Sequence, residues 1–202
     1  TPVDYKDLPE HLVNALVSTE DERFYDHSGI DARGTARAVV FLGRKGGAST
    51  ITQQLAKQLF TGVRTKNKIA AVVQKVKEWI IAVRLEKQYT KEEIITMYFN
   101  IYDFGNNADG IRSAARIYFG KEPKDLKLDE AAVLVGMFKN SSLYNPVRNI
   151  EGVSNRRNTV YVQMERNDMI SKEQRDSLSK LPIKLNFNPE SHSVGTATYF
   201  RM

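Results

Sequence analysis

The sequence predicts a mostly α-helical fold built as a single domain. Apolar residues recur three and four positions apart along several segments, as on one face of a helix, and strand signals are weak throughout. The chain has 202 residues, which is enough to bury a core without cross-links. It has no cysteine, so disulfides, thiol catalysis and cysteine-ligated metals are ruled out. Its longest apolar run, 131–138, is far shorter than the roughly 18 to 20 residues of a membrane-spanning helix.

The first predicted helix follows Pro9 and carries one apolar stripe. The residues with helical spacing are Leu12, Val13, Leu16 and Val17. Glu20 falls in the middle of this stripe, so its carboxylate must be paired or must favour its protonated form. The spacing also allows a helix that ends before Glu20 and leaves this side chain solvated.

The next predicted helices follow a glycine-rich interruption at 43–47. Ser49 or Thr50 can cap a helix that runs to about residue 60. A longer helix is predicted from about 67 to 88, with one apolar stripe made of Ile69, Val72, Val73, Val76, Ile80 and Val83. Its other side is also apolar and holds Glu78, which predicts the central helix of a bundle. Lys75 and Lys77 can supply counter-charge, and a purely structural ion pair at Glu78 remains an alternative.

Further helices are predicted in the second half of the chain. Thr90 and Glu93 form a capping box that opens a helix reaching Asn100. The other predicted helices cover about 109–118, 129–138, 151–166 and 172–179. The tail from Pro182 onward is polar and is predicted to form an extended linker.

The net charge of +6 is concentrated in one part of the chain. Residues 1–31 carry 2 basic and 8 acidic side chains, residues 32–91 carry 13 and 2, and residues 92–202 carry 15 and 14. The central segment therefore attracts anions such as nucleic acid, a phosphorylated substrate or an acidic lipid surface. A solubilising face is the alternative interpretation.

Five short motifs occur in order between about residues 10 and 160. The first two read EDERFYDHSG at 20–29 and GASTITQQLAK at 47–57. The others lie at 75–86, at 98–120 and at 139–146. Together they resemble the five motifs of the peptidoglycan glycosyltransferases, the transglycosylase domains of class A penicillin-binding proteins and their monofunctional relatives.

This resemblance implies a lysozyme-like fold with a substrate groove and a membrane-facing lobe. It assigns 1–185 to the glycosyltransferase domain and 186–202 to a connector toward a transpeptidase domain that the sequence does not contain. It further implies a location at the outer face of the bacterial cytoplasmic membrane. The full-length protein would be anchored there by an N-terminal helix that this sequence lacks.

The resemblance also implies the reaction and its residues. The family polymerises lipid II into β-1,4-linked glycan, inverts the anomeric carbon of the donor MurNAc and releases undecaprenyl diphosphate. Glu20 matches the general base that takes the proton of the acceptor hydroxyl, and Glu78 matches the second carboxylate, near the leaving group. Lys57, Arg64 and Lys77 are expected at the diphosphate. The other expected substrate-binding or groove-shaping residues are Asp21, Phe24, His27, Ser49, Thr50, Gln54 and Asn100.

Several residues have a structural alternative. His27 can satisfy backbone carbonyls at a helix end, and Phe24 and Tyr25 can belong to the core, with Phe24 beneath the base. The resemblance predicts no obligatory cofactor and no dedicated metal site, but leaves open a Mg or Mn ion at the diphosphate. The expected partners are lipid II, the growing glycan strand, the membrane surface and the inhibitor moenomycin, with no nucleic acid.

Two other functions compete with this interpretation. A lysozyme-like hydrolase or lytic transglycosylase would share the fold and a catalytic glutamate, but it has no need of a cationic cluster for a diphosphate. A non-catalytic module binding nucleic acid or membrane would fit the isoelectric point of about 9.4. No nucleic-acid-binding motif supports that module, and the basic residues do not alternate with aromatic ones.

Overall fold

Helices form nearly all the regular structure of this computed structural model, which describes residues 2–40, 49–62 and 67–189. The α-helices are α1 (Glu10–Glu20), α2 (Ala32–Val40), α3 (Ile51–Ala56), α4 (Lys68–Gln88), α5 (Lys91–Ile101), α6 (Gly110–Phe119), α7 (Leu128–Met137), α8 (Ile150–Arg166) and α9 (Lys172–Ser179). Short 3₁₀ turns lie at Tyr5–Asp7, Phe24–Asp26 and Pro123–Asp125, and a π-helical segment covers Lys57–Thr61. Within the described residues the only β pairing is an isolated bridge between Asp103 and Asp109, so the predicted mostly α fold is confirmed.

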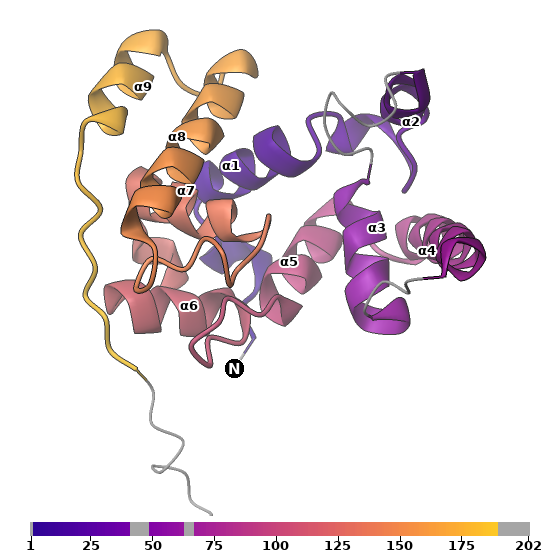
Figure 1. The fold of residues 1–202 in the computed structure, drawn as a ribbon, viewed down its shortest axis with the longest axis horizontal. Coiled ribbons are helices and arrows are strands. Elements are labelled where there is room, and N and C mark those ends of the chain that lie inside the picture. The colour runs from indigo at the N-terminus through magenta and orange to yellow at the C-terminus, as the bar shows by residue number, and fades with distance from the viewer. Residues whose placement is uncertain (1, 41–48, 63–66, 190–202) are drawn as a thin grey trace, which may run out of the picture.

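The core forms around α7, whose residues from Ala131 to Met137 are all buried. Helix α7 packs on α8 and α1, and α8 also packs on α1. Helices α3 and α4 pack on each other on the opposite side of α5, with α4 at the edge of the molecule (Figure 1). The junction between these two groups of helices is where the end of α1 meets the start of α3.

Most predicted helices are confirmed to within a few residues, because their ends carry strong local signals. Thr90 and Glu93 form the predicted capping box of α5, and Asn67 accepts from two backbone N–H groups at the start of α4. The helix predicted to reach residue 60 changes from α to π geometry at Lys57. Helix α2 was not predicted, although Asp31 accepts from the N–H of Gly34 near its start.

The prediction that α4 is central in a bundle is wrong. Its stripe of Ile69, Val72, Val73, Val76 and Ile80 is exposed, with Ile69 retaining 78% of its accessible surface. Only the opposite side, with Glu78, Ala82 and Leu85, is buried. Periodicity identified both apolar sides correctly, but it could not say which one meets the rest of the protein.

The chain beyond α9 runs as an extended segment along α6. The N–H groups of Asn186 and Asn188 donate to the carbonyls of Tyr118 and Ile117. Residues 190–202, which include most of the predicted connector, lie outside the described residues. Among the described helices, none combines the length and the apolar character needed to cross a membrane.

Candidate active site

A cleft of about 420 Å³ opens where α1 ends, between α3 and α4 on one side and the end of α7 on the other. Five of the residues predicted from the sequence line it, namely Glu20, Ser49, Gln54, Lys57 and Glu78. The other lining residues are Gln58, Ala71, Gln74, Lys75, Tyr102, Phe138 and Lys139. The fold therefore brings both predicted carboxylates to one cavity.

Glu20 is the last residue of α1, and its carboxylate is held on both oxygens. The amide nitrogen of Gln54 donates to Oε2 at 3.1 Å, and the guanidinium of Arg156 lies 3.4 Å from Oε1. The Glu20 side chain keeps 14% of its accessible surface, because it lies at the edge of the core and is open only toward the cleft. A paired carboxylate of this kind can accept a proton from a bound hydroxyl group.

Glu78 lies on the buried side of α4, and its carboxylate is 3.1 Å from the ammonium of Lys75. Lys75 also donates to the hydroxyl of Ser49 at 2.8 Å. The hydroxyl of Thr61 approaches the other oxygen of Glu78 at 3.4 Å. Lys75 thus connects Ser49, two residues before α3, to the second carboxylate of the cleft.

Among the described residues, three lysines line this cleft, Lys57, Lys75 and Lys139. Of the three cations predicted for the diphosphate, only Lys57 is among them. Lys77 lines a neighbouring hollow of about 600 Å³ with Phe60, Ile69 and other residues of α4. Arg64 lies outside the described residues.

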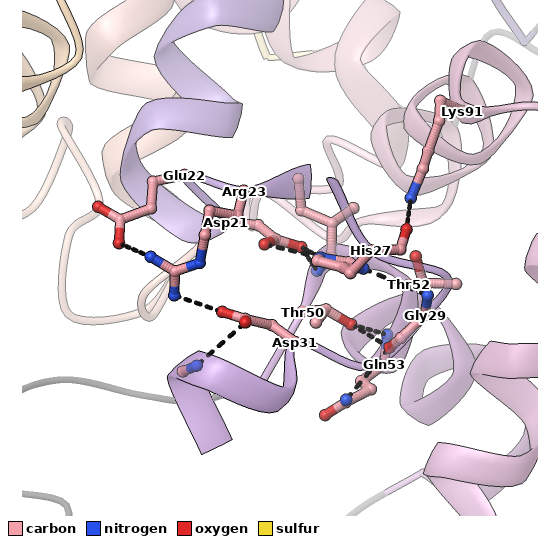
Figure 2. A network of polar contacts seen from close by, with 12 residues as sticks. Asp21, Glu22, Arg23, His27, Gly29, Asp31, Thr50, Thr52, Gln53 and Lys91 are labelled. Carbon is pink, nitrogen blue, oxygen red and sulfur yellow. Dashed lines mark hydrogen bonds and ion pairs between the residues drawn. The ribbon is translucent and has the colours of Figure 1, made fainter. Parts of the chain in front are cut away.

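The residues after Glu20 form a polar network with the start of α3 and with Lys91 (Figure 2). Asp21 is 7% exposed and accepts from the backbone N–H of Ile51 at 3.0 Å. The Nε2 atom of His27 lies 3.0 Å from the same carboxylate. Asp21 therefore joins the end of α1 to the first residue of α3, and so fixes Glu20 relative to Gln54.

Gly29 joins the loop after α1 to helices α3 and α4. Its carbonyl accepts from the Thr50 hydroxyl at 2.8 Å and from the Gln53 amide at 3.2 Å (Figure 2). Thr50 also caps α3, because its hydroxyl accepts from the N–H of Gln53. Gly29 has a φ of +91°, and a Cβ at this position would lie 2.8 Å from backbone atoms of Ala82 in α4. Glycine therefore allows the loop to touch α4 one turn beyond Glu78.

A partly buried cation, Lys91, supports this loop from the other side. The ammonium of Lys91 donates to the His27 carbonyl at 2.6 Å and pairs with Glu86 at 2.7 Å. It also lies 4.3 Å from the ring centroid of Phe24. Glu86 accepts in addition from the hydroxyl of Thr52 in α3 at 2.6 Å.

The remaining predicted residues lie away from the cleft. Phe24 is fully buried, in agreement with the core alternative, whereas Tyr25 is 57% exposed and the prediction that it is core is wrong. Asn100 holds the N-terminal segment to α5, because its side chain exchanges two hydrogen bonds with the backbone of Val3. Asp21, His27 and Thr50 support the cleft from beneath and do not line it.

Sequence reasoning assigned no role to Arg156, Tyr98 or Tyr102, which all surround Glu20. Arg156 comes from α8 and is 136 residues from Glu20, so no local spacing could have indicated the contact. Burial, together with the nearby charge of Glu20, raises the pKa of Tyr98 well above its usual range. Burial also raises the pKa of Tyr102 to about 12, although hydrogen bonds with Ser141 oppose the shift. Both phenols are therefore protonated at neutral pH.

The described residues bring no three histidine, aspartate or glutamate side chains together in a way that could hold a metal ion. In the cleft the Glu78 carboxylate is engaged by Lys75. This part of the chain therefore builds no protein cage for Mg²⁺ or Mn²⁺, and a divalent ion there would need most of its ligands from the diphosphate and water.

Comparison with known proteins gives one consistent result. The family model described as Transglycosylase matches residues 1–165. The chain is 40% identical over 183 residues to penicillin-binding protein 2a of Streptococcus pneumoniae, covering 91% of this chain and 24% of that protein. It is 37% identical over 191 residues to penicillin-binding protein 1A of Escherichia coli, covering 93% and 22%. The chain therefore spans about a quarter of the length of these relatives.

A crystal structure of penicillin-binding protein 1A from Haemophilus influenzae has a similar fold. The TM-score is 0.56 at 24% sequence identity, and the match covers 93% of this chain and 18% of that one. At this identity the likeness concerns the fold alone, and it agrees with the predicted lysozyme-like architecture.

Proposed function

Because this chain belongs to the transglycosylase family, the peptidoglycan glycosyltransferases of class A penicillin-binding proteins, we propose that its cleft polymerises lipid II into β-1,4-linked glycan. The observation that carries the proposal is one cavity that holds Glu20, Glu78 and three lysine ammonium groups. A displacement at a sugar diphosphate needs a base at the attacking oxygen and positive charge at the leaving group. The cleft contains both.

In this reaction the 4-hydroxyl oxygen of the acceptor GlcNAc attacks the anomeric carbon of the donor MurNAc. The carbon–oxygen bond to the diphosphate breaks on the opposite face, so the anomeric configuration inverts. The electron pair of that bond leaves with undecaprenyl diphosphate, and the hydroxyl proton goes to the Glu20 carboxylate. Arg156 and Gln54 keep this carboxylate oriented toward the cleft before the proton arrives.

The lysines stabilise the leaving group. Lys57 and Lys75 line the α3–α4 side of the cleft, and Lys139 lines it from the end of α7. Ammonium groups arranged in advance around a bound diphosphate stabilise its negative charge without reorganisation. Glu78 pairs with Lys75 at 3.1 Å, and we assign it the role of orienting that ammonium toward the leaving group. Lys77, predicted at the diphosphate, lines the neighbouring hollow and is not among the described residues that line this cleft, and Arg64 lies outside the described residues.

The membrane surface is the second part of the proposal. The exposed stripe of α4 continues onto the π-helical segment, where Leu59 and Phe60 are 44% and 62% exposed. The surrounding chain segment is strongly basic. Apolar side chains surrounded by basic ones suit insertion into the interface of an anionic membrane, where a lipid-linked substrate is found. We therefore place the enzyme at the outer face of the bacterial cytoplasmic membrane.

A polymerisation assay tests the reaction. The chain is incubated with lipid II, with and without moenomycin, and the products are separated by length; Glu20→Gln is assayed beside it. We expect polymer from the wild type, loss of polymer with moenomycin, and a rate lowered at least about 100-fold in Glu20→Gln, because the base is absent. Glu10→Gln, at the exposed first turn of the same helix, should keep its activity. A Glu20→Gln variant with a tenth of the wild-type rate would refute the assignment of the base.

A second substrate separates the reaction from hydrolysis. Purified glycan strands replace lipid II, and we expect no fragments, because the lysines of the cleft serve a diphosphate leaving group that a glycan lacks. Release of fragments without polymerisation of lipid II would favour the hydrolase or lytic transglycosylase.

Flotation with vesicles tests the membrane surface. Vesicles that contain phosphatidylglycerol should bind the chain in part, and added salt should weaken binding. A Phe60→Ser and Ile69→Ser double variant should bind less, while Leu143→Ser, an exposed leucine elsewhere, should bind as the wild type. Equal binding by all three proteins would exclude this stripe as the docking surface.

A further inference from the structure

The amide of Gln54 connects Glu20 to a buried phenol. Its nitrogen donates to Glu20 Oε2 at 3.1 Å, and its oxygen accepts from the Tyr98 hydroxyl at 2.7 Å. The three residues come from α1, α3 and α5, so the chain of hydrogen bonds crosses the junction of the fold. Gln54 lines the cleft, whereas Tyr98 is fully buried behind it.

This connection determines which end of the amide meets the carboxylate. A glutamine amide has nearly the same shape in both orientations, but only the nitrogen can donate. With the amide reversed, its carbonyl oxygen would face the Glu20 carboxylate, which is electrostatically unfavourable. A phenol that is protonated at neutral pH donates to the carbonyl and so favours the orientation in which nitrogen faces Glu20.

The phenol is itself fixed in place. The Tyr98 ring stacks on Phe138 with centroids 4.7 Å apart and planes inclined by 20°. Phe138 follows α7 and lines the cleft. The neighbouring glutamine, Gln53, is used differently, because its amide donates to the Gly29 carbonyl in the buried network. Of the two adjacent glutamines, only Gln54 is directed at Glu20.

We propose that Tyr98 is a positioning residue of the glycosyl transfer, which acts on Glu20 through the amide of Gln54. The inference rests on the proposed role of Glu20 as the base. Tyr98 touches neither substrate in this scheme. Its hydroxyl keeps the Gln54 nitrogen on the carboxylate, so that Glu20 stays charged and directed at the acceptor hydroxyl.

The variant Tyr98→Phe tests the inference, because it removes one oxygen and leaves the ring. We expect kcat to fall about tenfold, as for a lost hydrogen bond next to a charged group, with KM within about twofold of the wild type. The acid limb of the pH–rate profile should move to higher pH, since a donated hydrogen bond favours the charged carboxylate. Among the described residues, Gln54 and Arg156 contact Glu20, and the charged or titratable groups that line the cleft with it or lie near it also influence that limb: Lys57, Lys75, Glu78, Tyr98, Tyr102 and Lys139.

Two controls separate positioning from stability. Tyr118→Phe also loses a buried hydroxyl, which donates to the Phe104 carbonyl at 2.7 Å, but it lies away from the cleft. This variant should keep the wild-type kcat and pH profile even if it melts earlier. Adding Tyr98→Phe to Gln54→Ala should cause no further loss of kcat, because the two residues act through one contact.

The results distinguish the inference from the function on which it rests. If the wild type does not polymerise lipid II, the proposed function fails; if Glu20→Gln remains active, the assignment of Glu20 as the base fails, and the role of Tyr98 fails with it. If Glu20→Gln is inactive while Tyr98→Phe keeps the wild-type kcat and acid limb, only the role of Tyr98 is refuted. Additive losses in the double variant, or a kcat that falls only in proportion to the folded fraction measured by urea unfolding, would likewise refute it.

Discussion

Replacing Lys91 by methionine should strongly destabilise the domain, because the change leaves a buried carboxylate without its cation. Lys91 pairs with Glu86 at 2.7 Å and donates to the His27 carbonyl at 2.6 Å. The Glu86 side chain keeps only 4% of its accessible surface, and Thr52 would be its remaining hydrogen-bond donor among the contacts described above. Methionine preserves much of the apolar stem of lysine and removes the ammonium group.

The expected magnitude follows from this burial. Removing one partner of a buried ion pair costs about 3–5 kcal/mol, because the other charge remains desolvated and uncompensated. Domains are stable by only about 5–15 kcal/mol, so this loss is a large part of the total. For a chain of this length, 1 kcal/mol corresponds to a melting-temperature change of about 2–4 °C, which predicts a decrease of roughly 6–20 °C.

Urea unfolding of a double-mutant cycle measures the effect. The cycle contains Lys91→Met, Glu86→Gln and the double variant, in which the unpaired charge is absent. We expect the double variant to be more stable than Lys91→Met alone, since neutral glutamine is less costly to bury than an unpaired carboxylate. Lys6→Met is the matched control, because Lys6 pairs with Asp4 at a fully exposed site and should lose less than about 1 kcal/mol.

A Lys91→Met variant no less stable than Lys6→Met would show that Glu86 does not depend on the ammonium of Lys91. Losses of the two single variants at Lys91 and Glu86 that simply add in the double variant would show the same. Either result would mean that water or a rearranged side chain compensates Glu86 as well as the ammonium does.

Three other substitutions test the support beneath the cleft. Gly29→Ala should lower the unfolding free energy by at least about 2 kcal/mol, because φ is +91° and the new Cβ would collide with the backbone of Ala82; an unchanged melting temperature would show that the loop moves freely. Thr50→Ala should lower the unfolding free energy by about 1–2 kcal/mol, because α3 loses its cap, whereas Thr50→Ser should keep most of the wild-type stability. Equal losses in both variants would point to the methyl group of Thr50. Lys75→Met should lower the unfolding free energy by about 3 kcal/mol, because Glu78 loses its cation. Adding Glu78→Gln should restore part of this free energy in urea unfolding, and no restoration would contradict the ion pair.

The helices could be predicted from the sequence because their signals are local. The capping box at Thr90 and the Asn67 cap lie within one turn of the helix starts that they specify. Helix α2 was missed because its sequence, ARGTARAVV, is short and two of the four residues on its apolar side are alanines, alongside Val39 and Val40. Asp31 supplies a cap to it, but a cap before a short, weakly apolar segment is a weak indication.

The candidate site could be predicted only in part, for a related reason. The motifs supplied Glu20, Ser49, Gln54, Lys57 and Glu78, and the structure brings these five residues to one cleft. Contacts between distant segments could not be predicted. Arg156 meets Glu20 only because α8 packs on α1, and spacing along a single helix carries no information about such packing.

Helix α4 shows why a buried charge is more informative than an apolar stripe. Both of its sides are apolar in sequence, and burying the richer stripe of Ile69 to Ile80 would have removed more apolar surface from water. The fold instead buries the side that carries Glu78, because Lys75 pairs with this carboxylate and Gly29 contacts the backbone at Ala82. An exposed apolar stripe costs free energy while it stays in water. Under the proposed function, insertion of the stripe into the membrane that holds the substrate removes it from water and recovers this free energy. The arrangement that puts Glu78 in the cleft is therefore the same one that turns the exposed stripe of α4 outward.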